Sequence, residues 1–150
     1  MLLRTHLGFA ILMIILFVEH VTEKWIFVGV VLVATILPDL DSGFSTWGRH
    51  MIFKPLQFFT AHRGILHSFT FAILISILLS IFFPVAAFGF FVGYSVHLIS
   101  DSFTKEGVQA FWPLSGRSHG LIKSGGRVED GLFILIMLAD VLLFLIFFVL

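Results

Sequence analysis

The chain has 150 residues, of which 59% are hydrophobic and 12% are charged, and its mean hydropathy is +1.09. Soluble domains carry about a quarter charged residues, so this composition excludes an ordinary soluble fold and indicates a membrane protein. A formal net charge of zero gives no basis for bulk attraction to nucleic acid, and no nucleic-acid partner is predicted. The chain has no cysteine, so any metal would be held by His, Asp and Glu.

Five apolar runs follow one another, and each predicts a spanning or membrane-embedded helix. They cover residues 7–18, 25–37, 68–83, 85–99 and 131–150. Pro84 separates the third run from the fourth, because proline lacks a backbone donor and disfavours helix at the preceding residue. The first two runs span only about 18 to 21 Å of a hydrocarbon core of about 30 Å, so they must extend into polar flanks and bring His6 and Asp39 to membrane depth. The predicted fold is an all-α, polytopic integral membrane bundle that forms a single domain over residues 1–150.

The basic residues predict how this bundle is oriented. With five spans, the N-terminus, the 38–67 loop and the 100–130 loop share one side of the membrane. That side holds eight of the nine Lys and Arg residues, and only Lys24 lies opposite. Cytoplasmic loops carry the excess of Lys and Arg, so this side is predicted to face the cytoplasm. No small-residue cleavage site follows the first run, which is therefore interpreted as an anchor and not as a signal peptide.

Nearly all residues able to carry chemistry lie on the same side. Ionisable groups at membrane depth are costly, so they tend to be paired, metal-bound or water-lined, and they indicate a functional site. Scattered loop charges are the alternative interpretation. The residues are His6, Asp39, Asp41, His62, Arg63, His67, His97, Asp101, His119 and Glu129.

Two short motifs offer metal ligands. His97 and Asp101 end the fourth run at a spacing of i, i+4, which places an imidazole and a carboxylate on one helix face where they can grip one divalent ion. The LPDLD segment, residues 37–41, closes the second run and can direct carboxylate oxygens back toward the same place. A solvated acidic turn that simply ends the helix is the alternative for this segment.

A third motif, HRGILHS, leads into the third run and includes His62, Arg63 and His67. The guanidinium of Arg63 presents a fork of donors suited to phosphate, and the N-terminus of the following helix favours an anion. Positive-inside anchoring is the alternative explanation for Arg63.

Together these motifs resemble the YdjM-like family of membrane-bound metal-dependent hydrolases. The resemblance rests on His6 in RTHLGFA, on LPDLD, on HRGILHS, on GYSVHLISDSFTKEGVQAFWP and on Glu129 in SGGRVED, and it covers most of the chain in the family's order. Typical members have threonine where Leu66 stands, and nothing carries over to residues 132–150. More distantly, the series of ligands looks like that of zinc-dependent phospholipase C, whose later His ligands are poorly matched here, although His119 is a candidate for one.

The resemblance implies a metal-dependent hydrolase with one or two divalent ions, expected to be Zn²⁺. Arg63 would clamp a substrate phosphate, Asp39 would serve at the catalytic centre, and Glu129 would be a ligand or a general base. Membrane lipids are the expected surroundings, and the site's depth favours a lipid-like or other phosphoester substrate, with the oligomeric state left open. The expected metal ligands are His6, Asp39, Asp41, His62, His67, His97 and Asp101, with the choice between Asp39 and Asp41 open.

Two other function classes compete with this interpretation. Intramembrane His and Asp also line the paths of divalent-metal or proton transporters. Transport would need polar residues that continue across the bilayer, and here Asp140 alone lies in the middle of a predicted span. An HxxxD motif also occurs in the type 2 phosphatidic acid phosphatases, which use a His nucleophile without metal. Those enzymes carry an arginine six residues before the His and a PSGH segment, whereas this chain has Phe91 and no PSGH.

Overall fold

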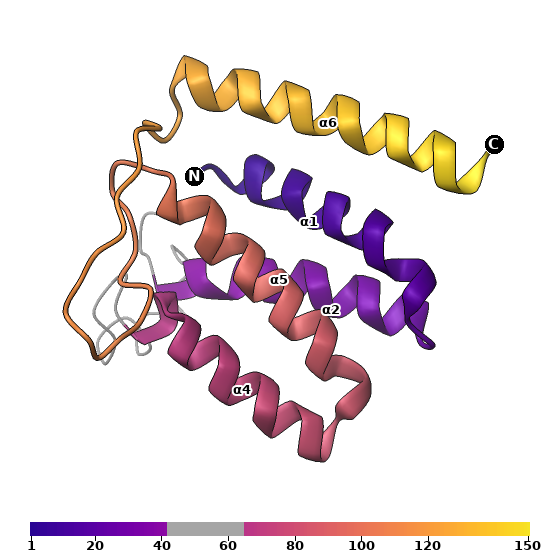
Figure 1. The fold of residues 1–150 in the computed structure, drawn as a ribbon, viewed down its shortest axis with the longest axis horizontal. Coiled ribbons are helices and arrows are strands. Elements are labelled where there is room, and N and C mark those ends of the chain that lie inside the picture. Colours follow the sequence, from indigo (N-terminus) through magenta and orange to yellow (C-terminus); the bar gives the residue numbers. More distant parts are fainter. Residues whose placement is uncertain (42–64) are drawn as a thin grey trace.

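The computed structural model describes residues 1–41 and 65–150, and within these the fold is all-helical. The α-helices of the described residues are α1 (Leu3–Phe17), α2 (Lys24–Ile36), α4 (Phe69–Phe82), α5 (Pro84–Ser102) and α6 (Arg127–Phe148). Short 3₁₀ turns follow α1 (η1, Val18–His20), follow α2 (η2, Leu37–Asp41) and precede α4 (η4, Ile65–His67). Successive helices run back and forth, so the starts of α1, α4 and α6 lie at the same end as the last turns of α2 and α5 (Figure 1). The prediction of an all-α membrane bundle is confirmed.

The helix boundaries follow the predicted runs and extend them into polar residues. α1 begins at Leu3 and so includes His6, while η2 continues from α2 to Asp41. Ser68 caps α4 by accepting a hydrogen bond from the Phe71 amide at 3.2 Å. Among the described residues, three segments are long and apolar enough to cross a membrane, namely Leu3–His20, Pro84–Ser102 and Arg127–Phe148.

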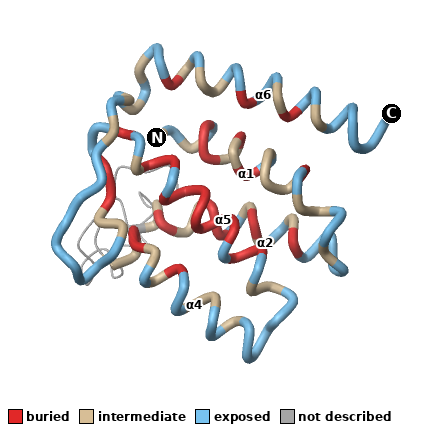
Figure 2. The backbone as a smooth tube through the Cα atoms, in the orientation of Figure 1, coloured by how far each residue is buried: buried red, intermediate tan, exposed pale blue. Residues whose placement is uncertain are grey.

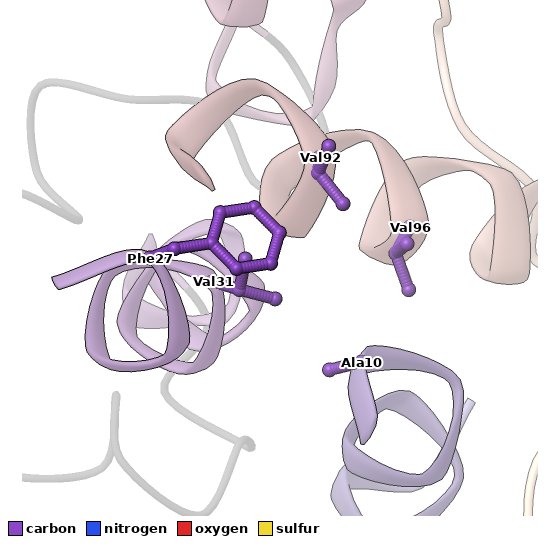
Figure 3. Packing of buried hydrophobic residues seen from close by; sticks show 5 residues of the cluster. All are labelled: Ala10, Phe27, Val31, Val92 and Val96. Atoms are coloured by element: carbon purple, nitrogen blue, oxygen red, sulfur yellow. The ribbon is translucent and has the colours of Figure 1, made fainter. Parts of the chain in front are cut away.

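Helix α5 is the centre of the bundle. One cluster of buried side chains joins it to α1 and α2 and consists of Ala10, Phe27, Val31, Val92 and Val96 (Figure 3). A second cluster joins it to α2 and α4 and consists of Ala34, Ala72, Phe90, Tyr94 and Leu98. Gly93 lets α5 approach α2 closely, because a Cβ atom there would lie 2.3 Å from the Val31 carbonyl oxygen.

Helix α6 lies at the edge of the bundle, beside α1. Only 11% of its spanning window is buried, compared with 50% for α5, and Figure 2 shows α6 as a mostly exposed helix with a few buried positions. Gly8 of α1 provides one close approach, since a Cβ there would lie 3.2 Å from Cγ2 of Ile136.

The segment between α5 and α6 is held together by backbone hydrogen bonds at the polar end of the bundle. Isolated β-bridges pair Thr104 with Ile122 and Val108 with Ser118. The Phe69 amide donates to the Ala110 carbonyl at 2.7 Å, which ties the segment to the start of α4. The segment therefore covers the end at which the predicted site residues gather.

Candidate metal centre

His97 lies at the middle of the polar end, and its orientation is fixed by α2. The side chain is fully buried, and Nδ1 lies 2.8 Å from the backbone oxygen of Thr35. A carbonyl oxygen can only accept, so Nδ1 carries the proton and donates it. The lone pair of His97 is therefore on Nε2, which has no hydrogen-bond partner within the described residues. A histidine held by its other ring nitrogen in this way is typical of metal ligation.

Two groups of side chains around His97 could each hold a metal ion. The first consists of His6, Asp39 and His97, and the second consists of His67, His97 and Asp101. In each group the ligand atoms lie within 4.8 Å of one another. Four separate elements contribute these residues, namely α1, η2, η4 and α5.

The distances within the cluster fit a shared cation. His97 Nε2 lies 3.7 Å from Asp101 Oδ2 and 3.9 Å from Asp39 Oδ1, which is too far for hydrogen bonds. Two atoms bound to one ion at bonds of about 2.1 Å lie at most about 4.2 Å apart, so both separations suit ligands of one zinc ion. The buried imidazole nitrogens and carboxylates thus match the donor set that zinc prefers.

The imidazole rings pack directly against one another. His6 and His97 are stacked, with ring centroids 4.1 Å apart, and His67 meets His97 edge-on at 5.4 Å. Because Nδ1 of His97 is engaged with Thr35, Nε2 is the one atom that His97 can offer to a metal. The two groups therefore share a ligand atom with one lone pair, so His97 can serve only one of them at a time.

Asp101 is the charged partner of several groups at this centre. Its side chain is almost completely buried, and Oδ1 lies 3.3 Å from His6 Nε2 and contacts the ammonium group of Met1. Positive or hydrogen-bonding groups thus face a carboxylate that would otherwise be costly to bury.

His67 is positioned by bonds on either side of it. The Tyr94 hydroxyl of α5 donates to the Leu66 carbonyl, and Ser68 Oγ donates to the Ile65 carbonyl at 2.6 Å. Position 66, where the sequence departs from the family's threonine, contributes its backbone oxygen to this arrangement. The leucine side chain therefore does not disturb the anchoring of His67.

The carboxylate of Glu129 accepts three hydrogen bonds. Its fully buried carboxylate accepts from the Leu2 amide at 2.6 Å, from Thr5 Oγ1 at 2.8 Å and from the Gly125 amide at 2.6 Å. It belongs to neither metal group among the described residues. The contacts join the start of α6 to the start of α1, one residue away from His6, which favours a positioning role. The role of Glu129 as a ligand or a general base stays a prediction.

The remaining predicted residues divide into two kinds. His119 is exposed, and its Nδ1 lies 3.1 Å from the Lys105 carbonyl oxygen, so it is not part of either metal group. His62, Arg63 and the side chain of Asp41 lie outside the described residues. Their assignments as ligands, or for Arg63 as a phosphate clamp, stay predictions.

Two threonines that support the site were not identified from the sequence. Thr35 orients His97 through a backbone carbonyl, and no side-chain pattern marks such a contact. Thr5 donates to Glu129, which lies 124 residues further along the chain. Its position next to His6 in the first turn of α1 is the one local signal for it.

The fold and the cluster define the class of protein: a helical membrane protein with a buried His and Asp centre at one end of its bundle. The chain belongs to the YdjM inner membrane protein family, whose profile matches residues 1–149. The family assignment and the apolar helices place the protein in the membrane.

Two curated relatives support the assignment. The chain is 33% identical over 104 residues to the inner membrane protein YdjM of Escherichia coli and, with the same values, to that of Shigella flexneri. The match covers 63% of this chain and 53% of each relative, so the chain spans about half the length of the curated relatives it matches. No solved structure matches the chain.

Proposed function

We propose that this protein is a membrane-bound, metal-dependent hydrolase that holds one zinc ion and acts on a phosphoester of a lipid or a lipid-linked molecule. His97 and two or three of His6, His67, Asp39 and Asp101 would hold the ion, which leaves a coordination position for water or substrate. The observation that carries the proposal is the arrangement around His97, whose Nε2 faces the carboxylates of Asp39 and Asp101 at 3.9 and 3.7 Å without a hydrogen-bond partner within the described residues.

When bound, a zinc ion supplies a Lewis acid for a phosphoryl oxygen and lowers the pKa of a coordinated water toward neutrality. The side chain of Asp39 is 21% exposed, whereas those of His97 and Asp101 are almost completely buried. Substrate and water would therefore approach from the side of Asp39, so Asp39 would lie next to the reacting groups. Arg63 would bind the phosphate through its bidentate guanidinium.

The depth of the cluster supports a membrane substrate. Its residues come from the first turns of α1, from the last turn of α5 and from the turns that follow α2 and precede α4. All of these lie at one end of apolar helices, the level at which lipid headgroups meet hydrocarbon. A similarity to zinc-dependent phospholipases fits this location and stays part of the proposal.

The proposed orientation places the metal centre at the cytoplasmic face, with α1, α2, α4, α5 and α6 as five passes. It rests on the eight Lys and Arg residues of the predicted cytoplasmic side. Since the natural chain has no cysteine, Ser118→Cys introduces a unique thiol at that end. We expect this thiol to react with a membrane-impermeant maleimide only after the cells are opened. Labelling in sealed cells would reverse the orientation.

The central test combines metal analysis with a hydrolysis screen on phospholipids and other phosphoesters. We expect one equivalent of zinc per chain, activity that chelators abolish and that zinc restores, and loss of both zinc and at least about a hundredfold of activity in Asp101→Ala. Asp130→Ala is the matched control, because Asp130 lies at the same end but forms a half-exposed ion pair with Arg4. Metal-free protein that is fully active would refute the metal-dependent mechanism.

Arg63→Lys separates substrate binding from metal binding. Lysine keeps the charge but loses the bidentate fork, so we expect zinc content to be unchanged and transition-state stabilisation to fall by about 1 to 3 kcal/mol. A residue that serves only as a positive-inside anchor would give a fully active lysine variant.

The same measurements distinguish the competing function classes. A His-nucleophile phosphatase would keep its activity in chelator and would trap a phosphohistidine. A transporter would move zinc or protons into sealed proteoliposomes and would not hydrolyse any phosphoester of the screen.

A further inference from the structure

A second site lies between α1 and α6, toward the far ends of both helices from the metal centre. It is a cavity of about 480 Å³, lined by Ile11 and Ile14 of α1, by Val18 of η1 and by Val141, Phe144 and Phe148 of α6. Its volume falls within the range of about 300 to 1,000 Å³ that is usual for small-molecule sites. His6, a proposed metal ligand, lies in the first turn of α1, before the first residue of this lining.

Asp140 is the one ionisable side chain among the described residues that line this cavity. It is 4% exposed, and neither carboxylate oxygen has a hydrogen-bond partner among the described residues. A buried carboxyl group without a partner costs several kcal/mol in an apolar environment, as a rough estimate. Such residues within membrane spans usually mark a functional position.

We propose that this cavity binds a lipophilic amine, with its hydrocarbon chain along the apolar wall and its ammonium group against Asp140. The apolar lining requires a hydrocarbon body. The unpartnered carboxylate requires a donor, and a cation satisfies it best because charge-assisted hydrogen bonds are the strongest available. The site is separate from the metal centre and does not depend on the hydrolase proposal.

The position of α6 gives such a ligand a route from the bilayer. Within the described part of the chain, α6 packs mainly against α1, and its other faces are exposed. A hydrocarbon chain can therefore enter laterally between the two helices. A second copy of the chain would instead be expected to pack on the exposed face, where Leu138 and Leu142 are 62% and 59% exposed, and not against a carboxyl group that is enclosed by its own α1.

The experiment uses the full chain in phosphatidylcholine nanodiscs and a photoactivatable dodecylamine as the probe. Crosslinked peptides are mapped by mass spectrometry, and dodecylamine, dodecanol and dodecane are compared as competitors. Asp140→Asn removes the charge with little change of shape, and Ile14→Trp fills the cavity. Ile134→Trp is the matched control, because this α6 residue is 58% exposed and does not line the cavity.

We expect labelling of α1 and α6 residues around Asp140, with dodecylamine the strongest competitor. In Asp140→Asn the apparent affinity for the amine should fall about tenfold or more, since the ammonium group then faces a neutral amide oxygen and not a carboxylate. Ile14→Trp should abolish site labelling, and Ile134→Trp should leave it unchanged. Equal competition by amine and alkane, or equal labelling of wild type and Asp140→Asn, would overturn the proposal. The proposal would also be overturned if the wild type showed no labelling at this site and formed a dimer that Ile14→Trp dissociates. The cavity would then be the place where a second copy of the chain packs.

Discussion

Helices α5 and α6 are both long enough to span a membrane, yet they occupy opposite situations in the bundle. The spanning window of α5 is 50% buried and that of α6 is 11% buried, although α6 is the more apolar of the two. α5 carries Gly89 and Gly93 at its contacts with α2, and it carries His97 and Asp101 at the candidate metal centre. In a bilayer the apolar helix is the one that lipid solvates, whereas small and polar residues mark the helix that faces protein.

The largest expected loss in the free energy of unfolding concerns a buried leucine of α5. Leu98 of α5 is fully buried, while Leu138 of α6 is 62% exposed. Leu98→Ala should lower the free energy of unfolding by about 3 kcal/mol, because it opens a cavity between α2, α4 and α5. Leu138→Ala should change it by less than about 0.5 kcal/mol, since lipid fills the space. Denaturant titration in micelles measures both, and similar losses would mean that α6 is enclosed by a partner.

A somewhat smaller loss of stability is expected at the buried glycine. Gly93→Ala forces a methyl group against the Val31 backbone, with a loss of about 2 to 3 kcal/mol. Gly131→Ala in α6 meets no atom within 4 Å and should stabilise the helix by up to about 1 kcal/mol, because alanine is the better helix former. Thermal unfolding of the two variants side by side tests the close approach of α5 and α2. A stable Gly93→Ala variant would contradict it.

The smallest effect concerns the polar connection that holds the start of α6. Glu129→Gln replaces an acceptor oxygen by a donor facing other donors, so we expect a stability loss of about 1 to 2 kcal/mol. Because His6 follows Thr5 directly, zinc should also bind about tenfold more weakly. The role of a positioning residue further predicts that added zinc restores the rate. Asp130→Asn, at the adjacent half-exposed position, serves as the control. A Glu129→Gln variant that stays inactive in hydrolysis when saturated with zinc would show a direct catalytic role.

Much of the fold could be predicted because apolar runs and Pro84 act locally. The five runs agree with the five described α-helices, and the extension of α1 and α2 into polar residues follows from the thickness of the membrane. The order of burial among the helices could not be predicted from hydrophobicity. Apolar residues face lipid as readily as they face protein, and hydropathy does not distinguish the two.

The sequence predicted which residues form the candidate site better than it predicted the role of each residue. The spacing of His97 and Asp101 placed both on one face of α5, and the structure brings Asp39, His6 and His67 to them. Glu129 was interpreted as a ligand or a base, and its three hydrogen bonds to the start of α1 and to Gly125 could not be inferred from sequence. His119 was a candidate for a further ligand, but its exposed position near Lys105 keeps it outside the metal groups.

The sequence by itself determined that the chain is a membrane protein, which five segments form the described α-helices, and that most of its candidate site residues gather at one end. These properties depend on composition, on local backbone preferences and on the opposite directions of successive helices. All of these are encoded within short segments. The tertiary structure alone decided that Nε2 of His97 is the atom turned toward Asp39 and Asp101, and that Asp140 is enclosed against α1. Both depend on the rotation and spacing of helices distant in sequence, which are set by the packing of side chains such as Gly93 and Gly8.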